Sequence, residues 1–188
     1  MKPIRDFIVN IPKRFKDEIE LSNGSKLWLA SKYREFENRV TSGIVLNVPA
    51  KDSMGVCEGD VMYFHHHVVT TLDNFSQEIE KKKFSVRGDQ AIAYKGKDGQ
   101  VKTIGDWILV EPMDQENDLK SEVVDLIQDT VNSKGRVKYM SKEHPDLNLG
   151  DVVEFSKNSD YEIEVEGSPM WRMRYDDIMF VWLEEDDQ

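Results

Sequence analysis

Glu18-Ile19-Glu20-Leu21-Ser22-Asn23-Gly24-Ser25-Lys26-Leu27-Trp28-Leu29 is the stretch on which the predicted fold depends. Its first four residues alternate charged and apolar side chains, which is typical of a strand with one buried face. Asn23-Gly24 then favours a hairpin, because both central residues of a type I′ turn adopt positive φ angles. The sequence therefore predicts a β-hairpin here, followed by a further strand at residues 42–49.

The hairpin carries an apolar triplet, Leu27, Trp28 and Leu29. On a strand, residues 27 and 29 share one face and residue 28 takes the other, so one core cannot cover all three. Two interpretations stay open. The hairpin is either buried on both sides, or it belongs to a loop whose apolar tip docks in the groove of a partner protein.

Composition limits the classes of partner and compartment. The 188 residues suffice for one large domain or two small ones. The net charge of −11 argues against nucleic acid, because phosphate contacts need clustered Lys and Arg. Cys57 is the only cysteine, which excludes an internal disulfide and fits a reducing compartment. The sequence shows neither a signal peptide nor an apolar run of membrane-spanning length, so we expect a cytoplasmic protein with no membrane partner.

A pattern of short strands occurs twice along the chain. The matching segments are Arg5-Asp6-Phe7-Ile8-Val9-Asn10-Ile11-Pro12 with Gly105-Asp106-Trp107-Ile108-Leu109-Val110-Glu111-Pro112, residues 43–48 with 135–140, and Gly59-Asp60-Val61-Met62-Tyr63-Phe64 with Gly150-Asp151-Val152-Val153-Glu154-Phe155. Short strands separated by turn signals favour an all-β barrel or sandwich. An internal repeat favours two units of that kind.

The repeat predicts a first unit at residues 1–112 and a second, shorter unit at 106–188, with a polar linker at about 113–120. Residues 106–112 fit both the closing strand of the first unit and the opening strand of the second. Either the two units share this strand or one of them is abbreviated.

The strand pattern predicts the structure of three connecting segments less clearly than that of the strands. Residues 65–71 are expected to prolong the strand at 59–64, and residues 73–83 to form a short helix or a loop. Residues 121–131 have apolar side chains at helical spacing, which favours a helix. A second flexible loop is the alternative there.

The order of these motifs resembles that of the GroES-type co-chaperonins, the small lids of the 60-kDa chaperonins. Gly150-Asp151-Val152-Val153-Glu154-Phe155, Tyr161-Glu162-Ile163-Glu164-Val165 and Asp176-Asp177-Ile178-Met179-Phe180-Val181 follow one another as in the closing region of that family. The resemblance covers nearly the whole chain, twice. It implies an all-β fold of two tandem GroES-like β-barrels, with the sharing of the middle strand left open, and assembly into a homo-oligomeric ring.

The resemblance also implies a binding site. In that family an aliphatic triplet at the tip of a mobile loop contacts the chaperonin, and Leu27, Trp28 and Leu29 occupy its place. Val123, Val124 and Leu126 are a possible second loop contact, although Asp125 interrupts them. The implied activity is nucleotide-dependent capping of a 60-kDa chaperonin that assists protein folding, with no nucleotide bound by this chain.

The chain departs from the family pattern in two respects. Residues 50–58 and 141–149 are too short for the family's roof hairpin. A missing roof is a feature of some phage-encoded co-chaperonins, which this chain resembles more than the cellular lids. Host cytoplasm is the compartment that a phage origin would imply. Tandem duplication occurs otherwise in plastid co-chaperonins, but the transit peptide of a plastid protein is absent from this sequence.

Other candidate sites are weaker. His65-His66-His67 invites a metal ion, and residues 65 and 67 would point the same way on a strand. A catalytic zinc typically needs three protein ligands, and no Cys or acidic ligand pattern accompanies the pair, so we expect no metal site.

The sequence contains no phosphate-binding Gly loop and no Gly-x-Ser-x-Gly. We therefore expect neither an enzyme nor a cofactor. The alternative function, of another class, is a GroES-like structural or assembly module, such as a virion or scaffold component, with no chaperonin partner.

Overall fold

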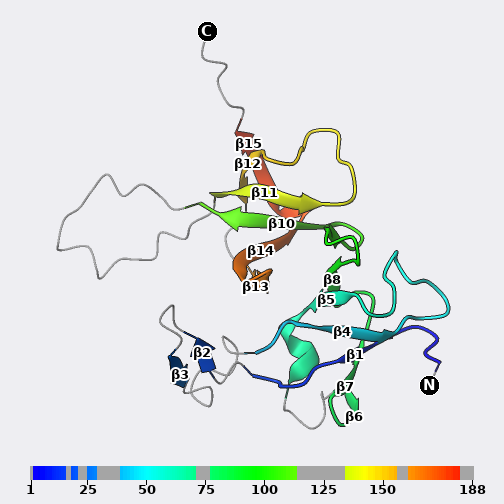
Figure 1. Ribbon diagram of the computed structural model, residues 1–188. Coiled ribbons are helices and arrows are strands. Elements are labelled where there is room, and N and C mark those ends of the chain that lie inside the picture. The colour runs from blue at the N-terminus through cyan, green and yellow to red at the C-terminus, as the bar shows by residue number, and fades with distance from the viewer. Residues whose placement is uncertain are drawn as a thin grey trace. The chain divides into compact units, whose positions relative to one another are not determined.

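A computed structural model of the protein describes residues 2–15, 18–20, 25–28, 39–70, 77–113, 134–155 and 161–182. This part of the chain is all-β (Figure 1). Its strands form a seven-stranded sheet, a six-stranded sheet and a separate two-stranded hairpin. The chain divides into two compact units, Met1–Val101 and Lys102–Gln188.

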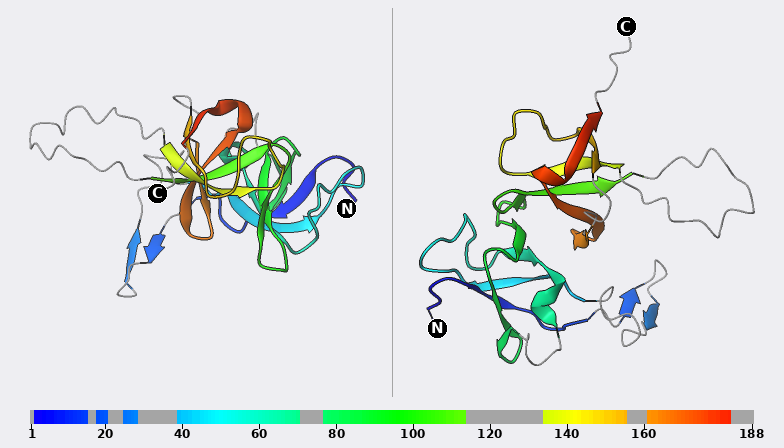
Figure 2. Two further views of the ribbon diagram at one scale, coloured as in Figure 1. Left: turned by 90° about the horizontal axis from the view of Figure 1, so that it is seen from above. Right: turned by 180° about the vertical axis from the view of Figure 1, so that it is seen from behind.

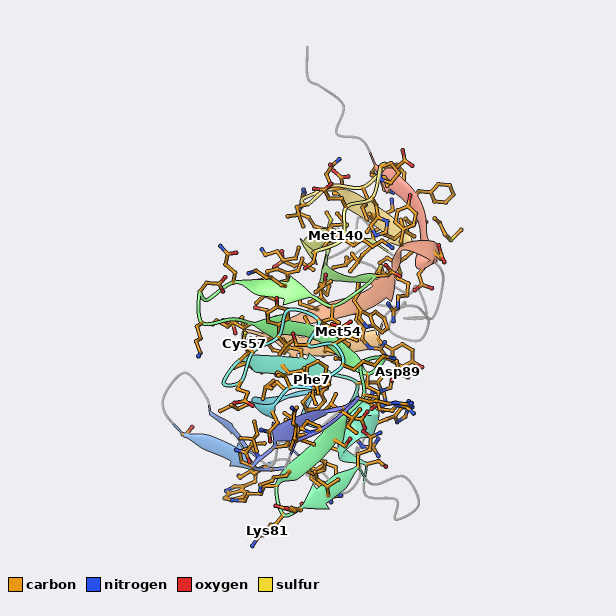
Figure 3. All side chains as sticks on the ribbon, turned by 90° about the vertical axis from the view of Figure 1, so that its right-hand side faces the viewer. Phe7, Met54, Cys57, Lys81, Asp89 and Met140 are labelled. Carbon is orange, nitrogen blue, oxygen red and sulfur yellow. The ribbon has the colours of Figure 1, made fainter. Side chains whose placement is uncertain are left out.

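The first unit is built on the sheet β6-β7-β1-β4-β5-β8-β9. Its strands are β1 (Phe7–Asn10), β4 (Ser42–Asn47), β5 (Val61–Phe64), β6 (Glu78–Glu80), β7 (Lys83–Val86), β8 (Ala91–Lys95) and β9 (Val101–Thr103), and the 3₁₀ helix η1 (His66–Val69) follows β5. Phe7, Phe64 and Phe84 are buried in its core. Figure 3 shows Phe7 among these strands and Lys81 pointing outward from the turn between β6 and β7.

The second unit is built on the sheet β13-β14-β10-β11-β12-β15. Its strands are β10 (Trp107–Pro112), β11 (Lys134–Met140), β12 (Val152–Phe155), β13 (Tyr161–Val165), β14 (Ser168–Arg174) and β15 (Ile178–Trp182), and the 3₁₀ helix η2 (Tyr175–Asp177) precedes β15. Alternation of apolar and polar residues, as in β12 and β13, places one face inward. The core consists of Ile108, Val110, Val137, Leu147, Val153, Phe155 and Met173.

The two sheets follow one topological plan. If β1 is matched with β10, β4 with β11, β5 with β12 and β8 with β15, then β6-β7-β1-β4-β5-β8 and β13-β14-β10-β11-β12-β15 are the same order. The central pairs β1–β4 and β10–β11 each contain a register irregularity, at Ile8/Val9 and at Leu109/Val110. The internal repeat is therefore present in the strand pairing.

The turn before the third strand of each unit is also repeated in detail. Gly59 and Gly150 have φ angles of 92° and 95°, in the left-handed region that glycine adopts without strain. Their N–H groups donate to the carbonyls of Val45 (2.8 Å) and Val137 (2.9 Å). The aspartate that follows each glycine accepts a backbone N–H three residues upstream, at 2.8 Å in both turns. The Gly-Asp motif is thus a structural turn.

The strand at residues 106–112 belongs to one sheet. β10 pairs with β11 and β14, both in the second unit, and the boundary between the units lies at Val101/Lys102. In the first sheet β8 takes the place that β15 takes in the second. The equivalence of β8 and β15 is hard to recognise in the sequence, because Gln90 precedes β8 whereas an aspartate, Asp177, precedes β15. Gln90 Oε1 accepts the N–H of Arg87 as Asp177 Oδ2 accepts that of Arg174.

Two expectations for connecting segments are wrong. Residues 66–69 form η1 instead of prolonging β5, and residues 78–80 form β6, which pairs with β7, where a short helix or loop was expected. Residues 114–133, with the expected helix or second loop, lie outside the described residues. Among the described residues no helix is long and apolar enough to cross a membrane.

The close packing of the central strand pair generates a prediction about stability. A Cβ atom at Gly43 would lie 2.6 Å from Val9 Cγ1 and 2.7 Å from the carbonyl oxygen of Asn10. We expect Gly43→Ala to lower the free energy of unfolding by about 1–3 kcal/mol, because backbone must move. Urea denaturation measures this. Gly88→Ala is the matched control, since its Cβ would meet only the flexible side chain of Met54. Equal losses in the two variants would contradict the packing argument.

Candidate partner-binding hairpin

The segment with the apolar triplet leaves and rejoins the first unit at one point. Phe15 and Arg39 form an isolated antiparallel bridge, and the N–H of Val40 donates to the carbonyl of Arg14 at 3.0 Å. Arg39 is buried. The chain between residues 15 and 39 is therefore an insertion between β1 and β4 whose two ends lie together.

Within this insertion β2 (Glu18–Glu20) and β3 (Lys26–Trp28) form the antiparallel hairpin that the sequence predicts. The pairs are Glu18 with Trp28, Ile19 with Leu27 and Glu20 with Lys26. Figures 1 and 2 show the two blue strands side by side. They make up a sheet of their own.

The register of the hairpin differs from the simplest turn. A two-residue Asn23-Gly24 turn continued by regular pairing would place Glu20 opposite Leu27, whereas Glu20 lies opposite Lys26. An odd number of residues therefore lies between Glu20 and Lys26, whereas a two-residue turn with regular pairing leaves an even number.

Trp28 is the residue of the triplet whose side chain the structure describes, and it is 73% exposed. A hairpin buried on both sides is therefore wrong for this residue. Leu27 lies in β3 opposite Ile19. Leu29 and the possible second contact at Val123, Val124 and Leu126 lie outside the described residues.

Arg14 fixes the base of the insertion to the first sheet. Its guanidinium donates to the carbonyl of Thr70 at 3.1 Å, forms an ion pair with Glu78 and lies over the ring of Phe84. The backbone N–H of Lys82, followed by the Arg14 hydrogen bond, lowers the pKa of Glu78. These contacts connect the insertion with η1 and with the hairpin β6–β7.

A second exposed apolar element lies in the other unit. Met179, Phe180 and Trp182 on β15 are 58%, 57% and 50% exposed, and β15 is an edge strand. The equivalent strand β8 lies between β5 and β9, and its residues Ala91 and Ile92 are buried. In the sequence, β15 is recognisable only as part of the closing motif. Its five consecutive apolar residues were the available signal.

The chain shows no match to protein-family models and none to curated proteins. The geometry of the hairpin and of β15 is therefore the basis for the function proposed below.

The Arg14–Glu78 pair generates a pH prediction. Because the folded-state pKa of Glu78 lies below its ordinary value, its contribution to stability is present above that ordinary value and is lost as the pH falls through the lowered pKa. We expect Glu78→Gln to lower the free energy of unfolding by up to about 1 kcal/mol at pH 7.

The stability difference between Glu78→Gln and the wild type should shrink below about pH 4 and vanish in stronger acid. Denaturant titrations at pH 7, 5 and 3 measure it. Glu162→Gln, an exposed acid of the second unit, is the control and should show no comparable trend. A deficit of Glu78→Gln that is constant with pH would contradict the assignment.

Proposed function

We propose that this protein is a co-chaperonin. It assembles into a ring, caps a 60-kDa ATP-dependent chaperonin through the hairpin that carries Leu27, Trp28 and Leu29, and thereby assists protein folding. The observation that carries this proposal is the exposed Trp28 on a separate hairpin. Tryptophan is a frequent binding hot spot because its large side chain gains much from burial in a partner.

The organisation of the two units supports the same proposal. We interpret each sheet as an open GroES-like barrel, because both have one strand order and the first carries a long insertion after its opening strand. Within the described residues each sheet ends in two edge strands. In this interpretation the duplication lies within one chain, and the partner-binding hairpin extends from the first copy.

Ring assembly strengthens the binding that the hairpin provides. One hairpin with a few apolar anchors binds a partner modestly, whereas several on one ring bind together through their high effective concentration. The apolar edge strand β15 is the surface on which we place the contact between neighbouring chains, because an unpaired edge can receive a strand of another chain. A head-to-tail contact of this kind closes into a ring.

Trp28→Ala tests the capping hairpin. We expect binding to a 60-kDa chaperonin in the presence of ATP or ADP to weaken about 10-fold or more. The oligomeric state and thermal stability should not change, because Trp28 is exposed. Pull-down with and without nucleotide measures the binding.

Ile4→Ala is the matched control for Trp28→Ala, since Ile4 is a 71% exposed apolar residue of the same unit. It should bind like the wild type. A folded wild-type protein that binds no chaperonin under any nucleotide condition would overturn the proposal. Unfolding of Trp28→Ala would instead identify the triplet as core.

The second candidate function is a structural or assembly module that forms oligomers and has no chaperonin partner. The specific observation that favours it is the exposed edge β15, which serves assembly without requiring the hairpin. Oligomers that form normally but fail to bind chaperonin would select this candidate.

The assembly surface is tested with the double variant Met179→Lys, Phe180→Lys. Charges on an exposed edge strand oppose pairing with another chain, so we expect the oligomer to dissociate to monomers while the circular dichroism spectrum is preserved. Light scattering after gel filtration gives the mass. Ile4→Lys controls for added charge and should keep the wild-type mass. A wild-type protein that is monomeric at micromolar concentration would disprove this surface.

A further inference from the structure

We propose that His65, His66 and His67 form a binding site for a divalent transition-metal ion of the zinc class. The three residues lie where β5 ends and η1 begins. His65 has an extended backbone, with φ −65° and ψ 136°, and is the N-cap of the helix. This site is independent of the hairpin and of the function proposed above.

The change from strand to 3₁₀ helix is what brings the third ligand in. On a continued strand His66 would point away from the other two. In the structure one ring nitrogen from each of the three histidines lies within 4.8 Å of the others. The ring centroids are 4.2–4.4 Å apart in all three pairs. Three possible ligand atoms then lie close together, which is the number that a catalytic-type zinc site takes from the protein.

The remaining adjustment is small. Nitrogens bound to one zinc ion at about 2.1 Å in tetrahedral geometry are about 3.4 Å apart. The nitrogens of this cluster, within 4.8 Å of one another, therefore need to approach by roughly 1.4 Å at most. Rotation of side chains supplies such a movement, since His65 and His66 are half-buried and His67 is exposed.

Hydrogen bonds and buried side chains fix the backbone of the cluster at both ends of η1. The N–H of His65 donates to the carbonyl of Gln90 at 3.0 Å, and Val68 and Val69 are fully buried. The carbonyl of Thr70 accepts a hydrogen bond from Arg14. Because the segment is already ordered, an ion would bind without the cost of ordering a loop.

The hydrogen bonding at His65 already provides one suitable nitrogen. Its Nδ1 accepts the backbone N–H of His67 at 3.2 Å, so this atom presents a lone pair, and a metal needs an unprotonated nitrogen. An ion either replaces this long hydrogen bond at Nδ1, or binds Nε2 after the proton moves to Nδ1. In both cases the N-cap bond of η1 is exchanged for the metal bond.

The ligand set selects the class of ion. Imidazole nitrogens suit zinc, copper and nickel, whereas magnesium and calcium prefer oxygen ligands. Three protein ligands leave a tetrahedral ion one position for water or for a group from another molecule. The net charge of −11 also favours the approach of cations.

Calorimetric titration with Zn²⁺ tests the site. The full chain is purified without a polyhistidine tag and is titrated in a buffer free of chelators. We expect one ion per chain, bound with a Kd below about 10 µM. His66→Asn should weaken binding at least about 10-fold, and the variant with all three histidines replaced by Asn should abolish this binding event.

Two controls separate the cluster from other ligands. His144→Asn removes the fourth histidine of the chain, and Cys57→Ser removes its exposed thiol. Both should bind Zn²⁺ like the wild type. A Kd weaker than about 10 µM, or binding that the triple substitution leaves unchanged, would overturn the proposal.

A second measurement does not depend on how the variants fold. Zn²⁺ added to the wild-type protein should shift the imidazole ring resonances of His65, His66 and His67 in NMR spectra, with saturation at one equivalent. The ring of His144, which stacks on Tyr175 in the second unit, should not shift. Shifts confined to His144, or none at all, would contradict the site.

Discussion

A close approach of two backbones, which only a residue without a side chain allows, lies at the centre of each unit. At Gly43 and at Gly135 a Cβ atom would lie 2.7 Å from a carbonyl oxygen, that of Asn10 and of Glu111 respectively. Both glycines belong to the second strand of the pairs β1–β4 and β10–β11, and both pairs contain an irregular register. Such irregularities bend strands and increase their twist. The other strands pair outward from these central pairs in the same order.

The insertion between β1 and β4 leaves this arrangement intact. Its ends meet at the Phe15–Arg39 bridge, and Arg14 connects its base with Thr70, Glu78 and Phe84. These contacts attach the hairpin β2–β3, which carries the exposed Trp28, to the first sheet. Proteins commonly place binding residues on a segment that a rigid scaffold positions.

The two copies of the plan differ at the edge of the sheet and in the position of their 3₁₀ helices. The last strand of the shared order is buried and flanked by β9 in the first unit, whereas in the second it is an exposed apolar edge. The histidine-rich helix η1 follows β5, while the described helix η2 of the second unit precedes β15. The repeated core fixes the strand order, and these differences are the features to which we assign assembly, partner binding and metal binding.

The sequence by itself determined most of the strands, the Gly-Asp turns and the repeat, but not β6. Alternation of side chains and the need for a positive φ at Gly59 and Gly150 are local properties. The sequence also located the hairpin and the triplet around Trp28. The tertiary structure decided that β10 pairs with β11 and β14 in the second sheet, that Glu20 lies opposite Lys26, and that residues 66–69 form a 3₁₀ helix. Strand partners and the exposure of Trp28 and Phe180 depend on residues far away in the sequence. No local pattern specifies which remote segment covers a given strand, and that is why these features required the folded structure.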